Sequence, residues 1–164
     1  MMPIKLSEAI RFGATRAPVL AAEGLQLVGV WELQSIDIKF RDNGKHRRAN
    51  MAIPSGYLIF TALGRLLAMV TRSSRAQSGA ERASEALFRA TFAYSGRYRL
   101  EDGRWITRVD RTWNDAWTDA EQTRWYSLEG ERLEVASAWH LGAKPDDRLQ
   151  RTVFSFRKMK LRPH

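Results

Sequence analysis

Cysteine is absent from the 164-residue chain. A disulfide framework, a thiolate metal site and a cysteine nucleophile are therefore excluded. Histidine is also scarce, and His46, His140 and His164 are too scattered to suggest metal ligands, so we expect no metal site. The sequence also lacks a nucleotide phosphate loop, a serine–histidine–aspartate arrangement and a dinucleotide fingerprint. We therefore expect no cofactor.

Long apolar runs are missing as well. No segment approaches the roughly 20 apolar residues of a membrane span. Glu8, Arg11 and Arg16 interrupt the apolar residues near the N-terminus before they reach the length of an export signal. We therefore expect a soluble, cytoplasmic protein without a membrane partner.

The chain does contain enough apolar surface for a folded domain. Hydrophobic residues make up 44% of the sequence and include six tryptophans, which argues against disorder. A length of 164 residues suits one domain with a single core. No internal repeat or interdomain linker divides the chain.

The formal net charge of +9 has two explanations. Basic proteins attract nucleic acids and acidic membrane surfaces. The arginines here are nevertheless spread along nearly every segment, and the dense cluster 45–48 follows Asp42, Asn43 and Gly44 at what resembles a loop tip. We expect a solvated exterior that helps to capture an anionic ligand, and no specific nucleic-acid partner.

Residues 27–40 predict a long strand that opens with Gly29 and Trp31 in a Gly-x-Trp step. Strict alternation would place Trp31, Leu33, Ser35 and Asp37 on one face. We expect Trp31 to close the floor of a barrel, with Arg157 from the last strand over its indole in a cation–π contact.

Seven further strands follow from alternating patterns and glycine-containing turns. We predict them at 56–61, 65–71, 94–100, 104–113, 122–128, 133–139 and 149–158. A short helix is expected at 7–15, and a capping box at Ser78 and Glu81 predicts an inserted helix that ends near Phe92. Eight antiparallel strands in up-and-down order can close into a barrel that holds one small ligand.

Five segments of the chain resemble the bacterial and fungal lipocalin-like domain family, whose members are small calycin-type barrels. They are 27–35 (LVGVWELQS), 54–64 (PSGYLIFTALG), 94–98 (YSGRY), 113–117 (WNDAW, followed by Gln122 and Arg124) and 128–133 (LEGERL). The resemblance covers most of the chain from Leu27 to Arg157. It implies a mostly β protein with an eight-stranded lipocalin-like barrel and one inserted helix at 27–160. The residues before it, 1–26, are expected from their own pattern to form a partly helical lead-in.

The resemblance implies an enclosed pocket but no settled activity. Related barrels serve as carriers, and others act as cyclases or isomerases in natural-product pathways. Relatives often have histidines in the fifth strand, where this chain has Thr107 and Arg108. Acid–base chemistry by histidine is therefore not carried over.

The fifth strand carries the most unusual residues for a barrel interior. One face has Arg108, Asp110 and Asn114, and the other has Trp105, Thr107, Val109, Arg111 and Trp113. If the Arg108–Asp110 face points inward, it meets Gln122, Arg124 and Tyr126 of the next strand and can bind a carboxylate, phenolate or enolate. If it points outward, Arg108 and Asp110 form an ordinary exterior ion pair.

These residues define the candidate site. Asp110 is the candidate general base, and Tyr126 or an arginine would stabilise the developing oxyanion. The candidate ligand-binding residues are Ser35, Met69, Arg108, Asn114, Trp117, Gln122 and Arg124. Trp117 and its neighbour Trp113 either rim the pocket mouth or pack the barrel end.

Three functions fit the sequence. The first is binding of a small apolar or aromatic molecule with an anionic end. The alternative is a cofactor-independent cyclase or isomerase that acts on a biosynthetic intermediate in the same pocket. The third is nucleic-acid binding through the basic surface, which a contiguous basic stripe with exposed aromatic residues would favour. We expect a small-molecule partner, and the sequence also allows a homodimer.

Overall fold

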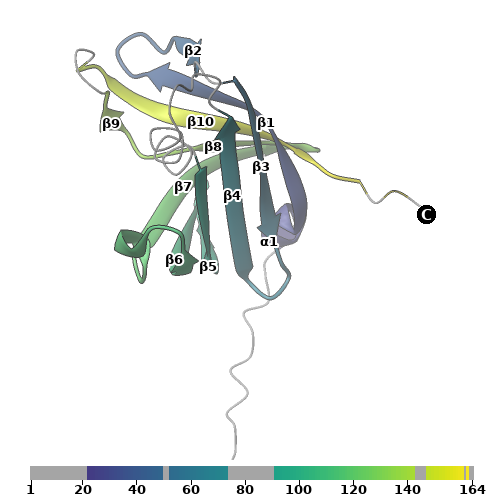
Figure 1. The fold of residues 1–164 in the computed structure, drawn as a ribbon. Helices are drawn as coiled ribbons and strands as arrows, with labels where there is room; N and C mark the ends of the chain where they lie inside the picture. Colours follow the sequence, from purple (N-terminus) through teal and green to yellow (C-terminus); the bar gives the residue numbers. More distant parts are fainter. Residues whose placement is uncertain (1–21, 50–51, 74–90, 143–146, 161, 163–164) are drawn as a thin grey trace, which may run out of the picture.

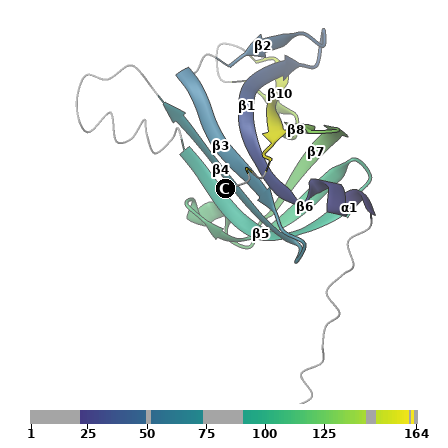
Figure 2. The ribbon, with the colours of Figure 1, turned by 90° about the vertical axis from the view of Figure 1, so that its right-hand side faces the viewer.

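The computed structural model describes residues 22–49, 52–73, 91–142, 147–160 and 162. Its strands form one antiparallel sheet (Figures 1 and 2). Eight of these strands form a barrel: β1 Gly29–Phe40, β3 Ala52–Phe60, β4 Arg65–Ser73, β5 Thr91–Glu101, β6 Arg104–Thr112, β7 Glu121–Glu129, β8 Arg132–Ala136 and β10 Leu149–Lys158. The short strands β2 His46–Arg48 and β9 His140–Leu141, the helix α1 Ala22–Leu27 and the 3₁₀ turn η1 Asp115–Trp117 complete the described elements.

The sheet closes on itself because its first and last long strands pair. β1 and β10 are antiparallel neighbours from Trp31 opposite Lys158 to Phe40 opposite Gln150. The remaining barrel strands pair in the order β1-β3-β4-β5-β6-β7-β8-β10, each with its neighbour along the chain once β2 and β9 are set aside. Closure leaves no free edge among these eight strands. The predicted eight-stranded up-and-down barrel is confirmed.

β1 contains a bulge that changes which residues face the interior. Its pairing with β10 shifts register between Leu33 and Ser35. Trp31 and Leu33 are buried before the bulge, and Ile36, not Ser35, is buried after it. Because one extra residue reverses the alternation, the predicted single face running from Trp31 to Asp37 is wrong beyond Leu33.

The floor of the barrel is built around Trp31. Its side chain is fully buried, and its Nε1 donates a 2.8 Å hydrogen bond to the carbonyl oxygen of Leu27 at the end of α1. Figure 1 shows α1 at this end of the barrel and β2 at the other. The cation over the indole is Lys158, with Nζ 5.1 Å from the ring centroid. The prediction of Arg157 is wrong because Lys158 is opposite Trp31 in the register, whereas Arg157 is opposite Glu32.

The predicted helices fall mostly outside the described residues. This is true of 7–15 and of 78–90, while Thr91 and Phe92, expected at the end of the inserted helix, belong to β5. α1 spans the predicted boundary between the lead-in and the barrel. No helix in the described part of the chain is long and apolar enough to cross a membrane.

Candidate functional site

The two faces of β6 are unambiguous in the structure. Trp105, Thr107 and Val109 are at most 1% exposed and point into the barrel, whereas Arg108 is exposed on the outside. Trp105 and Val109 therefore face the interior, whereas Ile106, although only 7% exposed, lies on the same outer face as Arg108. The face with Arg108 and Asp110 points outward, so these two residues do not line the interior.

Asp110 lies on the outer surface, where it is bound by Arg65 of β4. Arg65 Nη2 is 3.1 Å from Asp110 Oδ1, Nη1 binds the other carboxylate oxygen, and Ser95 Oγ donates to Oδ1 at 3.2 Å. The hydrogen bond from Arg65 is the main cause that lowers the pKa of Asp110 below its ordinary value. A carboxylate held in this way is a weak base. An exterior ion pair does form at Asp110, with Arg65 as its partner.

β7 turns three predicted residues toward the interior. In the register, Gln122 is opposite Thr107, Arg124 is opposite Trp105, and Tyr126 is opposite Val135 of β8. Residues directly opposite each other in an antiparallel pair share a face of the sheet. Because their partners are buried, the three half-buried side chains lie on the inner face. They share it with Trp105 and Thr107, whereas the sequence-based prediction paired them with the face of Arg108 and Asp110.

A small cavity lies between these residues and the opposite wall of the barrel. Its lining is Tyr57, Leu58, Ala68, Val70, Phe92, Tyr94, Trp105, Arg124, Val135, Phe154 and Phe156. Aromatic rings form much of the wall; Phe92 lies 6.4 Å from Tyr94 and 6.0 Å from Phe154, measured between ring centroids. The volume that the centre of a water molecule can reach is about 20 Å³. One ordered water needs about 10–15 Å³ on this measure, so this cavity has room for about one water molecule.

Arg124 is the charged group of this lining. Its Nη1 donates to the carbonyl oxygen of Thr123 at 2.8 Å, and its Nη2 donates to Gln122 Oε1 at 3.3 Å. Within the described residues, no carboxylate oxygen lies within 4.0 Å of its guanidinium. Burial raises the pKa of Tyr94, and the positive charge of Arg124 opposes that rise. The guanidinium of Arg124 is therefore close enough to Tyr94, in the aromatic wall of the cavity, to interact with it electrostatically.

Trp105 contributes a buried hydrogen-bond donor to the same cavity. Its side chain is 1% exposed and lines the cavity, and its Nε1 has no hydrogen-bond acceptor among the described residues. Leaving a buried N–H without an acceptor costs about 1–3 kcal/mol. Arg124 is opposite Trp105 in the register of β6 and β7, so the cavity has an unpaired donor and a cation on neighbouring strands.

Tyr126 is hydrogen-bonded to the helix at the floor of the barrel. Its hydroxyl donates a 2.8 Å hydrogen bond to Glu23 of α1, and its ring lies 5.4 Å from that of Trp105. Burial, reinforced by the hydrogen bond to Glu23, raises the pKa of Tyr126 well above its usual range. The phenol is protonated at neutral pH, and its proton points at Glu23. Tyr126 and Asp110 lie on opposite sides of the barrel wall.

The remaining predicted ligand-binding residues separate into two groups. Trp117 packs edge-to-face on Tyr94, with 5.9 Å between the ring centroids, and so lies behind the cavity wall. Asn114 caps η1, where its side chain accepts a hydrogen bond from the Ala116 amide at 3.1 Å. Met69 is 41% exposed between the buried residues Ala68 and Val70 and therefore points outward. The structure thus gathers Trp117, Gln122, Arg124 and Tyr126 around the interior, but not Ser35, Met69, Arg108, Asp110 or Asn114.

Sequence reasoning missed the aromatic wall of the cavity. Phe154 and Phe156 are separated by two positions in a predicted strand, which is the spacing of residues on one face. That spacing could have identified them. Phe92 lies at the predicted end of the inserted helix, and its place at the start of β5 shows only in the structure.

Comparison with known proteins agrees with the architecture. The sequence profile of the lipocalin-like domain family matches residues 28–159. No curated protein matches the chain. The crystal structure of an uncharacterized protein from Bacteroides eggerthii DSM 20697 is similar, with a TM-score of 0.40 and 17% identity, over 81% of this chain and 99% of that chain. The chain belongs to the lipocalin-like domain family.

Proposed function

We propose that the barrel binds a small apolar or aromatic molecule with an anionic end, and that Arg124 binds the anion. The observation that carries this proposal is the character of the lining: an otherwise uncharged, largely aromatic cavity contains one guanidinium without a carboxylate partner among the described residues. A flat apolar body suits the aromatic wall. A carboxylate or phenolate suits the guanidinium.

The energetics favour an anion over a neutral ligand. A partly buried cation loses hydration, and a charge-assisted hydrogen bond to an anion compensates for that loss. The indole N–H of Trp105, for which the described part of the chain provides no acceptor, would donate to the same anion or to a neighbouring oxygen. An anionic ligand would therefore satisfy two groups that the protein alone leaves incompletely paired.

Binding requires side chains to move, because the cavity holds about one water molecule. The aromatic pair of Tyr94 and Trp117 is the first place to look for that movement, since Trp117 is half-buried in the short turn η1. We infer that the ligand displaces aromatic rings at this end of the cavity. Tryptophan fluorescence should therefore change on binding.

The test is titration calorimetry with a panel of aromatic carboxylates and, for each, its neutral carboxamide. We expect the carboxylates to bind and the carboxamides to bind more weakly. Arg124→Gln should lower the affinity for the carboxylate about 10- to 100-fold, because the lost bond is charge-assisted. It should leave the affinity for the carboxamide nearly unchanged.

A matched control comes from Arg97, an exposed arginine on the outer face of β5. Arg97→Gln removes the same charge without touching the cavity and should change neither affinity. Equal losses in the two variants would mean that the net charge alone attracts the anion. Equal affinities for carboxylate and carboxamide in the unaltered protein would refute the role of Arg124.

The alternative of a cofactor-independent cyclase or isomerase stays a prediction from the sequence. Its two proposed catalytic groups, Asp110 and Tyr126, are bound to Arg65 and Glu23 respectively. No observation in the described residues favours catalysis over binding.

A further inference from the structure

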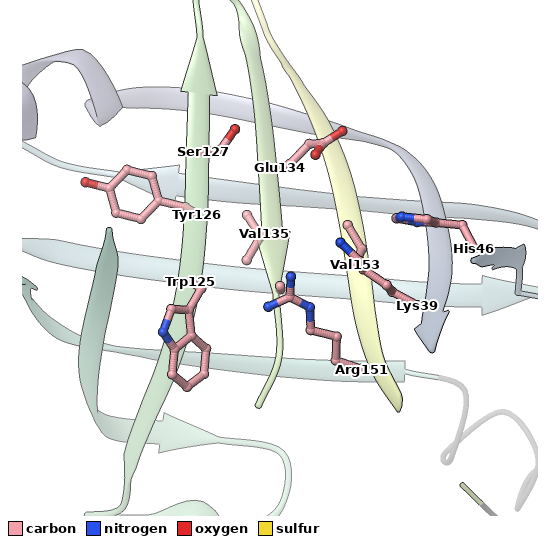
Figure 3. A pocket seen from close by; sticks show the side chains of 10 residues that line it. Lys39, His46, Trp125, Tyr126, Ser127, Glu134, Val135, Arg151 and Val153 are labelled. Carbon is pink, nitrogen blue, oxygen red and sulfur yellow. The ribbon is translucent and has the colours of Figure 1, made fainter. Parts of the chain in front are cut away.

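A groove crosses the outside of the barrel over β7, β8, β10 and the end of β1 (Figure 3). The volume in it that the centre of a water molecule can reach is about 170 Å³. The residues used below are Lys39, His46, Trp125, Glu134 and Arg151, which all line it. The groove is separate from the interior cavity, with which it shares only the wall residue Val135.

Three basic side chains form a row across neighbouring strands of this groove. Lys39 of β1 is opposite Arg151 of β10 on one side and opposite His46 of β2 on the other. Figure 3 shows Lys39, His46 and Arg151 extending over the strands toward the same part of the groove. The positive charges of Lys39 and Arg151, which are directly opposite each other in the sheet, repel. A bound anion between them would remove that repulsion.

The charges of this row are not neutralised by the described part of the protein. Within the described residues, no carboxylate oxygen lies within 4.0 Å of the charged nitrogens of Lys39 or Arg151. Other arginines of the same surface do have such partners: Arg48 binds Asp37 at 3.1 Å, and Arg132 binds Glu134 at 2.6 Å. The carboxylate of Glu134, which is in the groove, is thus already paired.

Arg151 is held in place without using its full set of donors. Its guanidinium carbon lies 4.6 Å from the centroid of the Trp139 ring, and Arg41 stacks over the same ring at 5.9 Å. Its Nε is buried and has no hydrogen-bond acceptor among the described residues. Stacking fixes the plane of the guanidinium, and a fixed guanidinium binds the oxygens of a phosphate in a bidentate manner.

We propose that this outer groove binds the phosphate group of a small phosphate monoester. Arg151 and Lys39 bind the phosphate oxygens, and His46 lies at the edge of the same site. Trp125 is 36% exposed beside the groove and offers its ring to a planar part of the ligand. A nucleoside monophosphate has both features, a dianionic phosphate and a planar base.

The experiment is calorimetric titration of the full chain at about 50 mM salt, where surface charges are only partly screened. The probes are inorganic phosphate, adenosine 5′-monophosphate, adenosine and a single-stranded oligonucleotide. We expect saturable binding of the first two, tighter for the monophosphate, and none of adenosine. Arg151→Gln and Lys39→Gln should each weaken binding at least about tenfold, because each removes a charge-assisted contact.

Two control variants separate this site from a general effect of charge. Arg97→Gln and Arg108→Gln should each change the affinity for the monophosphate less than about twofold, because both side chains are exposed and neither lines the groove. Since Arg151 packs on Trp139, Arg151→Gln could also disturb folding; Lys39→Gln removes a charge without removing a stacking contact, and thermal unfolding of each variant verifies the fold.

Four results would overturn the proposal. They are the absence of saturable binding, similar losses in Arg97→Gln and Lys39→Gln, binding of adenosine as tight as that of the monophosphate, and binding of a single-stranded oligonucleotide without binding of the monophosphate. The last result would indicate an extended polyanion surface.

Discussion

Gly96 allows β5 and β6 to approach each other closely, and its substitution gives a strong test of the fold. The pairing of the two strands shifts register between Ser95 and Gly96. A Cβ atom at Gly96 would lie 2.0 Å from the carbonyl oxygen of Arg108, 2.8 Å from its carbonyl carbon and 2.9 Å from Cγ2 of Thr107. Two of these three atoms belong to the backbone, so no side-chain rotation removes the clash. The strands themselves would have to separate.

We therefore expect Gly96→Ala to destabilise the protein strongly. Overpacking a core costs about 1–3 kcal/mol when side chains can adjust, and here the backbone must move, so we expect about 3 kcal/mol or more. For a chain of this size, that loss lowers the melting temperature by about 6–12 °C. Urea unfolding followed by circular dichroism measures the change in the free energy of unfolding.

Gly103→Ala is the matched control for Gly96→Ala. Gly103 lies in the β5–β6 turn with φ +64°, and a Cβ atom added there would meet no other atom within 4 Å. The substitution therefore adds only the backbone cost of a left-handed conformation, about 1–2 kcal/mol. If Gly96→Ala is no more destabilising than Gly103→Ala, the close strand contact is not what requires glycine at position 96.

Three further predictions concern the floor and the outer surface. Trp31→Phe should lower the free energy of unfolding by about 2–4 kcal/mol in urea unfolding, because it leaves a cavity and an unpaired Leu27 carbonyl. Tyr126→Phe removes the hydrogen bond to Glu23 and should cost about 1 kcal/mol, with faster amide hydrogen exchange confined to α1. The pKa of Asp110 is lowered below its ordinary value of 3.8, so the ionised form stabilises the fold above that value, and this stability is lost as the pH falls through the lower folded pKa. Asp110→Asn should therefore reduce stability at neutral pH and flatten its acid dependence, and a pH profile of thermal unfolding identical to that of the unaltered protein would contradict this.

Much of the barrel could be predicted from the sequence because its signals are local. The alternation of β5, β7 and β10 and the glycines in the turns at Gly64 and Gly103 depend only on neighbouring residues. The orientation of β6 was not predictable in this way. Both of its faces mix polar and apolar side chains. The sequence therefore did not determine whether the face with Trp105 and Thr107 or the face with Ile106 and Arg108 points inward.

The register also decided which cation covers Trp31. Arg157 and Lys158 are adjacent in sequence, and only the pairing of β10 with β1 brings Lys158 opposite the indole. The bulge between Leu33 and Ser35 had no sequence signal either, because it depends on the partner strand. These details arise from contacts between strands at the two ends of the barrel sequence, far apart along the chain.

The β1 bulge bears directly on the chemistry of the interior. Without it, strict alternation after Leu33 would turn Ser35 and the carboxylate of Asp37 inward. With it, Ile36 faces the core, and Asp37 binds Arg48 on the outer surface at 3.1 Å. An inward carboxylate at position 37 would be a buried negative charge, which is costly unless it is paired. The bulge thus places the only carboxylate between Ser35 and Phe40 on the outer face, where Arg48 pairs with it.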